Sequence, residues 1–252
     1  MNKKLTKLAA WSRIATRLAR NPGALNASVT DFQFLSDDET IRYLKDTGKG
    51  IVRYGDGELN FVAGYPAVHQ TQDPALRAKL TRILREYDGT QPYLLALPLD
   101  LLLTGNFAER NSTQENWRAP RYTTLPFLKK GVTYGSPFCF RLQDVISESP
   151  SEYRASVISL LEEKEIIYVG HKQHFEGRLS PVHYISIPKR DAYATYDQTL
   201  EEITGAVSAH ADPLVLVSAG VTATALAHDL NSRGILTYDI GALLTRLIPT
   251  NQ

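Results

Sequence analysis

Residues 214–224 read Leu-Val-Leu-Val-Ser-Ala-Gly-Val-Thr-Ala-Thr, an apolar run that meets a glycine turn and then the threonine-rich start of a helix. This pattern predicts a strand at 214–218 and a helix at 222–231. A strand that is apolar at almost every position is buried on both faces, which is typical of a parallel sheet covered by helices on both sides. The stretch therefore favours the α/β class.

The same alternation of helices and strands runs through the rest of the chain. Ser36 and Glu39 have the spacing of a capping box, which predicts the start of a helix. Residues 105–126 are polar and aromatic and predict a long loop with short helices. Since there is no internal repeat or low-complexity linker, residues 23–252 predict a single Rossmann-like domain with a mostly parallel sheet. The expected helices also cover 37–47, 74–87, 151–164 and 195–210, and the expected strands cover 51–54, 93–97, 166–169, 184–187 and 235–238.

Residues 1–22 predict a basic amphipathic helix ahead of this domain. They carry six basic side chains and no acidic one. Apolar residues, Leu8 and Ile14 among them, recur at three-to-four spacing, and a Pro-Gly pair ends the helix. Three placements stay open: on an anionic membrane surface, on a partner chain, or packed on the chain's own domain. A secretory signal is disfavoured because Arg13 and Arg17 interrupt the apolar stretch.

The formal charge of +1 over 252 residues hides an uneven distribution. Residues 23–252 hold 22 basic and 27 acidic groups, a net charge of −5. An acidic body has no general attraction for nucleic acid, so we expect no nucleic-acid partner. The lone Cys139 excludes an internal disulfide and a multi-cysteine zinc site, and it predicts a buried small hydrophobe. This cysteine usage fits a reducing, cytoplasmic compartment, and no apolar run reaches the ~18 residues of a membrane span.

In parallel α/β sheets, ligands bind beyond the carboxyl ends of the strands, so the turns there are candidate sites. The first is residues 53–58, Arg-Tyr-Gly-Asp-Gly-Glu. In an extended or turning segment, Asp56 and Glu58 can direct two carboxylates at one Mn²⁺ or Mg²⁺ ion, which takes its other ligands from water and phosphate. Gly55 and Gly57 allow close backbone approach, and Arg53 adds a cation for a diphosphate. The alternative is an ordinary turn with both acids in solvent.

The second candidate is the glycine turn at residues 219–224. Gly220 and Thr222 lie where the N-terminus of a helix can hold an anion, or they form a plain strand–helix junction. Arg141 and Asp239 are also expected at strand ends. Arg141 is an anion contact or an ion-pair partner, and Asp239 is a site residue or a cap.

The third candidate is the polar segment 170–176, which follows another strand. Lys172 is a candidate phosphate contact, and His171, His174 or Glu176 is a candidate general acid or base. The spacing matches no zinc motif, and the alternative is a solvated loop.

Taken in order, several of these segments resemble one known family. Their order and spacing over residues 35–242 are similar to those of the GT-D-type glycosyltransferases, a bacterial family linked to the glycosylation of serine-rich surface adhesins. The matching positions are residues 53–58, Gln70, Arg141, residues 188–193 (Pro-Lys-Arg-Asp-Ala-Tyr), Tyr196, residues 220–230 and residues 239–241 (Asp-Ile-Gly).

The resemblance implies a Rossmann-like fold of the GT-D type that moves a hexose from a UDP-sugar to a glycan or glycoprotein acceptor. The donor of the described members is UDP-glucose. Their Asp-x-Glu motif matches Asp56 and Glu58, with Mn²⁺ or Mg²⁺ bridging the diphosphate. Arg53 and the helix start at Gly220 would neutralise charge on the leaving UDP. Residues 1–22 would attach the enzyme to the inner face of the membrane or to a partner glycosyltransferase.

The chain departs from the family pattern after Asp239. Family members continue with a histidine and acidic residues, whereas Ala242 follows here and no acidic residue comes after Asp239. A general base from that region is therefore absent, and Asp239 or Glu176 is the expected substitute. Two other functions stay open: a catalytically weakened nucleotide- or glycan-binding scaffold for a partner glycosyltransferase, and a nucleoside- or phosphosugar-processing Rossmann enzyme.

Overall fold

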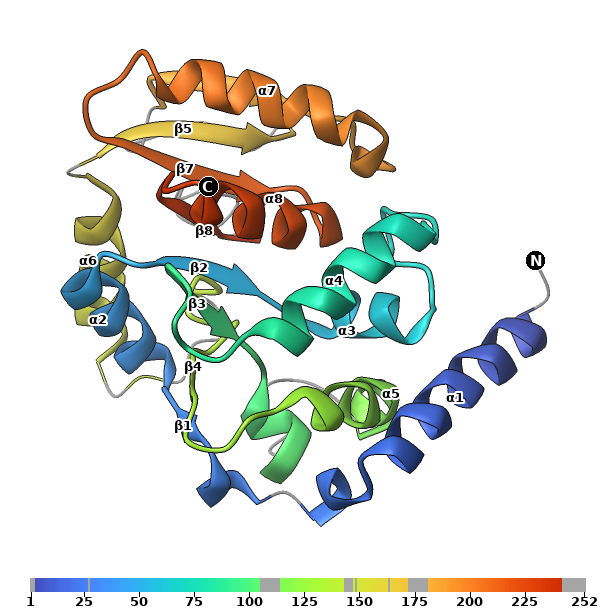
Figure 1. Ribbon diagram of the computed structural model, residues 1–252. Coiled ribbons are helices and arrows are strands. Elements are labelled where there is room, and N and C mark those ends of the chain that lie inside the picture. Colours follow the sequence, from blue (N-terminus) through green and yellow to red (C-terminus); the bar gives the residue numbers. More distant parts are fainter. Residues whose placement is uncertain are drawn as a thin grey trace, which may run out of the picture.

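A six-stranded, fully parallel sheet with the order β3-β2-β8-β7-β5-β6 forms the centre of the molecule (Figure 1). The computed structural model describes residues 3–26, 28–104, 114–142, 147, 149–162, 164–171 and 181–241. The strands are β2 (Gly50–Arg53), β3 (Tyr93–Ala96), β5 (Glu165–Gly170), β6 (His183–Ser186), β7 (Pro213–Ser218) and β8 (Thr237–Asp239). The predicted parallel α/β fold is confirmed.

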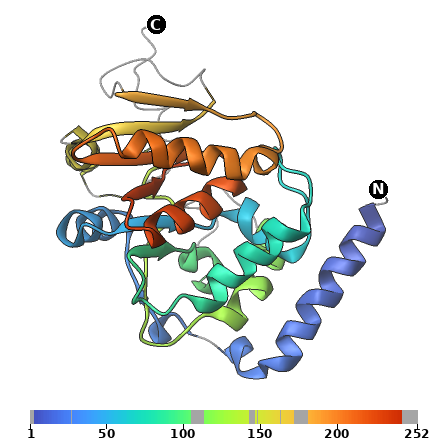
Figure 2. The same cartoon turned by 45° about the horizontal axis from the view of Figure 1, so that its top comes forward.

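Helices cover both faces of the sheet because the strands carry apolar side chains on both. On β7, Val215 and Val217 belong to a buried cluster shared with α7 (Tyr196–Val207) and α8 (Val221–Ser232). Leu214 and Leu216 belong to a second cluster, which includes residues of α2 (Asp37–Thr47) and α6 (Pro150–Glu162). Figure 2 shows α7 and α8 side by side in front of the strands.

The remaining elements follow the carboxyl ends of the strands or extend the sheet. A small parallel sheet joins β1 (Gln33–Phe34) to β4 (Thr133–Tyr134), and a bridge from Ala96 to Gly135 connects it with β3. The loop expected at 105–126 contains a regular helix, α5 (Gln114–Thr124). The other helices are α1 (Lys3–Arg20), α3 (Asp56–Ala63) and α4 (Pro74–Glu86). Short helical turns lie at Pro22–Asn26, Val29–Asp31, Asp100–Thr104, Leu125–Phe127 and Ala192–Thr195.

The helix α2 begins and ends where the sequence predicts. Ser36 and Glu39 form the predicted capping box, in which the N–H of Glu39 donates to Oγ of Ser36 at 3.2 Å and the N–H of Ser36 donates to Oε2 of Glu39 at 2.8 Å. Gly48 ends the helix with a φ of 63°, a conformation that glycine adopts without strain.

The helix α1 is confirmed, and it packs against α3 and α5 of the same chain; Figure 1 shows it beside α5. Its buried residues are Ala10 and Ile14, whereas Leu8 is 70% exposed, so the expected apolar stripe is wrong at Leu8. The ring of Trp11 meets the edge of Tyr122 with 6.1 Å between centroids. These contacts support packing on the chain's own domain. Within the described ranges, no helix combines the length and the apolar character that a bilayer crossing requires.

Candidate active site

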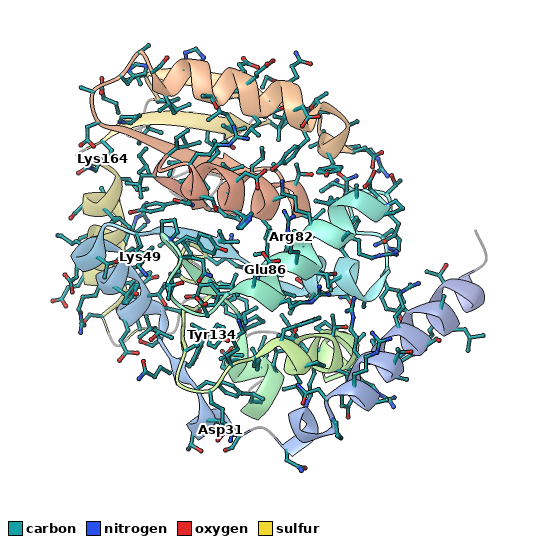
Figure 3. The ribbon with its side chains drawn as sticks, viewed as in Figure 1. Asp31, Lys49, Arg82, Glu86, Tyr134 and Lys164 are labelled. Atoms are coloured by element: carbon teal, nitrogen blue, oxygen red, sulfur yellow. The ribbon has the colours of Figure 1, made fainter. Side chains whose placement is uncertain are left out.

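The strand order brings together carboxyl ends that are far apart in the sequence. β2 pairs with β8, and β8 pairs with β7. The last residues of these strands are Arg53, Asp239 and Ser218, which therefore lie at one edge of the sheet. Lys49 and Lys164, labelled in Figure 3, precede β2 and β5 and mark the opposite edge. In α/β sheets, ligands bind at the edge where the strands end.

Arg53 and Asp239 form an ion pair at this edge. Nη1 of Arg53 lies 3.4 Å from Oδ1 of Asp239, and Nε of Arg53 donates to the carbonyl of Pro137 at 2.7 Å. The Asp239 carboxylate also accepts from the N–H of Gly241 at 3.2 Å and from the hydroxyl of Thr224 at 3.5 Å. With side-chain exposures of 11% for Arg53 and 6% for Asp239, the pair is nearly buried. The guanidinium is thus held in a fixed orientation.

Gly241 is required beside this pair for two reasons. Its φ of 55° lies in the left-handed region, which disfavours a side chain. A Cβ at this position would also lie 2.4 Å from Nη1 of Arg53. Any other residue here would displace the guanidinium.

The first turn of α3, and not an extended segment, carries Asp56 and Glu58. Gly55 is the N-cap, and its N–H donates to Oε2 of Glu58 at 2.8 Å. Residues two apart on a helix do not share a face: Asp56 is exposed, whereas Glu58 is half-buried within electrostatic reach of Asp239. The expected extended or turning segment is therefore the first turn of a helix, and the shared metal role of the two acids stays a prediction. Gly57 lies inside this helix with no atom within 4 Å of where its Cβ would be.

The carboxyl groups of Glu58 and Asp239 are both shifted toward their neutral forms. Burial raises the pKa of Glu58 to about 7, and the negative charge of Asp239 contributes in the same direction. Burial raises the pKa of Asp239 to about 6 despite the opposing effect of Arg53. One guanidinium therefore faces two acids, of which Asp239 is buried and Glu58 half-buried. An additional cation would favour their ionised forms.

The chemistry of these groups fits a divalent ion that is shared with a phosphate ligand. Within the described residues, no group of three or more His, Cys, Asp or Glu side chains could enclose a metal by itself. Mg²⁺, however, is usually held by one or two carboxylates together with water and substrate phosphates. Glu58 can supply one such carboxylate, and Asp56, which lies on another face of the same turn, can supply a second only from the solvent side of the ion. The excess negative charge favours the ion.

The turn between β7 and α8 adjoins this site. Gly220 is the N-cap of α8 with a φ of 55° and no side-chain capping bond. Thr222, in the first turn, is 1% exposed, and its hydroxyl donates to Oε1 of Gln70 at 3.3 Å. The structure therefore places this hydroxyl against Gln70, and a role of Thr222 in anion binding stays a prediction. In the first turn the N–H of Ala223 donates to the carbonyl of Gly220 at 2.9 Å, and the N–H groups of Val221 and Thr222 are the ones suited to an anion.

Arg141 follows a turn and not a strand. Residues 137–140 form this turn, in which the N–H of Phe138 donates to Oγ of Ser136 at 3.2 Å, so the strand end expected here is wrong. The guanidinium carbon of Arg141 lies 5.5 Å from the centroid of the Phe138 ring. Cys139 is fully buried, as predicted, and burial raises the pKa of its thiol.

The third predicted segment is only partly described. Lys172, His174 and Glu176 lie outside the described residues, and His171 directly follows β5. Gln70 and Asp191, in turn, have contacts near the site that no spacing pattern indicates. Only their positions in the resembling segments single them out, because the burial of a glutamine cannot be recognised from one sequence.

Comparison with known sequences points to one family. The profile of the glycosyltransferase GT-D fold matches residues 51–245. The "Probable glycosyl transferase Gly" of Streptococcus gordonii is 31% identical over 221 residues, which are 82% of this chain and 31% of that protein. Glycosyltransferase GlyD of Streptococcus pneumoniae is 23% identical over 217 residues, which are 81% of this chain and 26% of that protein. The chain thus spans less than a third of the length of these relatives.

Solved structures share the fold. The highly conserved domain of unknown function 1792, described as a distinct glycosyltransferase fold, aligns with a TM-score of 0.71 at 24% identity, over 85% of this chain and 80% of that one. A glycosyltransferase with this domain from Streptococcus sanguinis aligns with a TM-score of 0.65 at 23% identity, over 84% of this chain and 82% of that one. Because the family profile covers most of the sequence and includes every strand of the candidate site, the chain belongs to the family of glycosyltransferases with the GT-D fold.

Proposed function

We propose that the chain transfers a hexosyl group from a UDP-sugar, with UDP-glucose as the leading donor, to a hydroxyl of a bacterial surface glycan or glycoprotein. The observation that carries this proposal is the group of Arg53, Glu58 and Asp239 at the carboxyl edge of the sheet. It combines an oriented cation with carboxyl groups that favour a metal ion. Both features suit a diphosphate.

The transfer breaks the bond between C1 of the sugar and the β-phosphate oxygen, whose electron pair leaves with UDP. A new bond forms between C1 and the acceptor oxygen. Because negative charge develops on the diphosphate, the main task of the chain is to stabilise that charge. Arg53 is held for this task by Asp239 and by the carbonyl of Pro137. The first turn of α8 adds backbone N–H groups.

Asp56 and Glu58 are the residues that would hold Mn²⁺ or Mg²⁺. When bound, the ion supplies further positive charge to the departing diphosphate. The bond from the N–H of Gly55 fixes the Glu58 carboxylate through one oxygen. That bond orients the side chain before any ligand arrives.

The acceptor hydroxyl must also lose a proton. Asp239 accepts bonds from Arg53, Thr224 and Gly241, and this arrangement suits the orientation of Arg53 better than contact with an acceptor. We therefore assign Asp239 to positioning. The proton passes to a phosphate oxygen of the leaving group or to Glu176, which remains the candidate base.

Calorimetry with UDP and Mn²⁺ tests the site directly. The double variant Asp56→Ala/Glu58→Ala should lose most of the affinity of the unmodified chain. The matched control is Asp38→Ala/Glu39→Ala, which removes two acids from the first turn of α2 on the other face of the sheet. Affinity that survives in the Asp56/Glu58 variant would remove the metal assignment, and a lack of UDP binding by the unmodified chain would remove the donor class.

A panel of UDP-, GDP- and dTDP-sugars with Mn²⁺, followed by mass spectrometry, tests the donor without an acceptor. Hydrolysis of UDP-sugars above the others is the expected result. Preference for a non-uridine ligand would favour another Rossmann enzyme. Nucleotide binding without hydrolysis or transfer would favour a weakened scaffold.

The same proposal places the chain in the cytoplasm, since the single buried cysteine fits a reducing compartment. The outer face of α1 has Lys7 and Leu8 exposed and is the surface we propose for attachment to the inner face of the membrane or to a partner glycosyltransferase. Sedimentation with anionic vesicles, with and without 0.5 M salt, tests attachment to the membrane.

A further inference from the structure

Gln70, in the segment between α3 and α4, forms hydrogen bonds within its own segment, to the loop after β6 and to α8. Its Oε1 accepts from the N–H of Tyr193 and from the hydroxyl of Thr222, both at 3.3 Å. Its Nε2 donates to the carbonyl of Thr71 at 3.3 Å and to Oδ1 of Asp191 at 3.4 Å. The side chain is buried and its amide is fully engaged. We call Gln70, Thr71, Asp191, Tyr193 and Thr222 the Gln70 clasp.

Asp191 shows how firmly the clasp holds the loop after β6. Among the described residues, it is the one non-glycine residue with a positive φ, 53°. Aspartate adopts this conformation more readily than most side chains because its carboxylate can accept hydrogen bonds from nearby backbone groups. Here its N–H donates to the carbonyl of His69 at 2.8 Å, and its Oδ1 accepts from the N–H and the hydroxyl of Thr71 at 2.7 and 2.8 Å.

The clasp reaches the candidate active site through α8. Thr222 lies in the first turn of this helix, where Gly220 offers no side-chain cap. Two residues further, the hydroxyl of Thr224 donates to the carbonyl of Arg53 at 3.0 Å and contacts the Asp239 carboxylate. The first turn of α8 is thus held on one side by Gln70 and on the other by the strand that ends in Arg53.

We propose that Gln70 is a positioning residue for the nucleotide donor. Through Thr222 it fixes the first turn of α8, and through Asp191 it fixes the loop that carries the exposed cations Lys189 and Arg190. The backbone N–H groups of that turn and these two cations are then held at fixed positions relative to Arg53. Donors held in place in advance need no rearrangement when an anion binds. This inference rests on the proposed function.

Two substitutions separate the clasp from general stability. Gln70→Leu keeps the approximate size of the side chain and removes all four hydrogen bonds. The matched control is Gln72→Leu in the same segment. Gln72 donates to the carbonyls of Phe61 and Tyr65 and accepts from Nη1 of Arg77 at 3.3 Å, and among the described residues it has no hydrogen bond to α8 or Asp191. Both variants lose amide hydrogen bonds, so similar falls in Tm are expected.

The first measurement is hydrogen exchange of the ligand-free protein, followed on a peptide that covers residues 219–226. Gln70→Leu should exchange about tenfold faster there than the unmodified chain, whereas Gln72→Leu should match it. Equal exchange in all three proteins would overturn the inference whatever the chain binds.

The second measurement is the Kd for UDP with Mn²⁺. Gln70→Leu should weaken binding by roughly five- to tenfold, and Gln72→Leu by less than about twofold. A loss that is equal in both variants would mean that Gln70 acts on stability alone. If the unmodified chain binds no UDP while exchange behaves as expected, the proposed function fails and the clasp remains a structural feature without a donor role.

Gln70→Glu adds a readout that a loss of stability would not produce. The new carboxyl can still accept from Thr222 and Tyr193, but its negative charge would face Asp191 at pH 8. At pH 5.5 partial protonation restores a donor toward Asp191. The Kd of this variant, divided by that of the unmodified chain at the same pH, should therefore fall toward one on acidification, and a constant ratio would contradict the clasp.

Discussion

The substitution Glu58→Gln should stabilise the metal-free protein, although it removes a residue of the proposed site. Glutamine can still accept the hydrogen bond from the N–H of Gly55, because both residues suit the third position of a helix. What the variant loses is the negative charge. That charge is unfavourable in the folded chain because burial and Asp239 both oppose it.

The expected size of the effect follows from the pKa of Glu58. Its folded value of about 7 lies above the ordinary value of 4.5, and at about 1.4 kcal/mol per pKa unit full ionisation costs about 3–4 kcal/mol. Proton binding thus favours the folded state. Below pH 4.5 the ionisation of Glu58 does not change the difference in unfolding free energy between the unmodified chain and the variant. As the pH rises to 7, the unmodified chain loses stability relative to the variant. Water that reaches the half-buried side chain reduces the gain, so we expect about 2 kcal/mol at pH 8.

Urea denaturation followed by circular dichroism, in EDTA at pH 5 and pH 8, measures this difference. The control is Glu39→Gln, since Glu39 occupies the same position of the capping box of α2. It is exposed, and its hydrogen bonds with Ser36 lower its pKa. This control should change stability by less than about 0.5 kcal/mol and should not stabilise the protein at pH 8. The reasoning is refuted if Glu58→Gln is no more stable than the unmodified chain at pH 8, or if both variants gain equally.

Three further outcomes are expected. Gly241→Ala should lower the free energy of unfolding by about 1–3 kcal/mol, because Gly241 has a positive φ and lies close to Arg53. Gly205→Ala, in an open position of α7, should raise it by up to about 1 kcal/mol. Urea denaturation measures both, and the opposite ranking would count against the site geometry. Ile14→Ala should cost about 2–4 kcal/mol and Leu8→Ala less than about 0.5, and similar values for both would contradict the packing of α1 on its own domain. EDTA should weaken UDP binding roughly tenfold or more in calorimetry, and unchanged affinity would argue against a shared ion.

The parts of the fold that sequence alone predicted are those decided by neighbouring residues. The capping box of Ser36 and Glu39 sets the start of α2 through bonds that span three residues. The strands β5 and β7 are continuous apolar runs, and their burial follows from composition. Because such runs indicate a parallel sheet, they also predict a ligand site at the carboxyl edge, and that location stays a prediction.

The parts that sequence did not predict depend on distant residues or on competing local signals. The glycines at 55 and 57 suggest a turn, yet Gly55 is the N-cap of a helix, because Glu58 at the third position accepts from the N–H of Gly55. The Gly-x-x-Glu spacing of residues 55–58 was the sequence signal that could have predicted this helix start. Leu8 has the right periodicity but the wrong face, since α3 and α5 decide which side of α1 is covered. The burial of Thr222 depends on Gln70, which lies 152 positions earlier in the chain.

The pairing of Arg53 with Asp239 joins residues 186 positions apart, and this separation has a consequence for biosynthesis. A ribosome releases β2 long before β8, so an incomplete chain cannot place a carboxylate beside Arg53. Long-range contacts of this kind form late in folding. The proposed donor site should therefore be absent from nascent chains and from fragments that stop before residue 237, and these incomplete chains should neither bind nor hydrolyse a sugar nucleotide. Donor binding becomes possible only once β8 has joined the sheet.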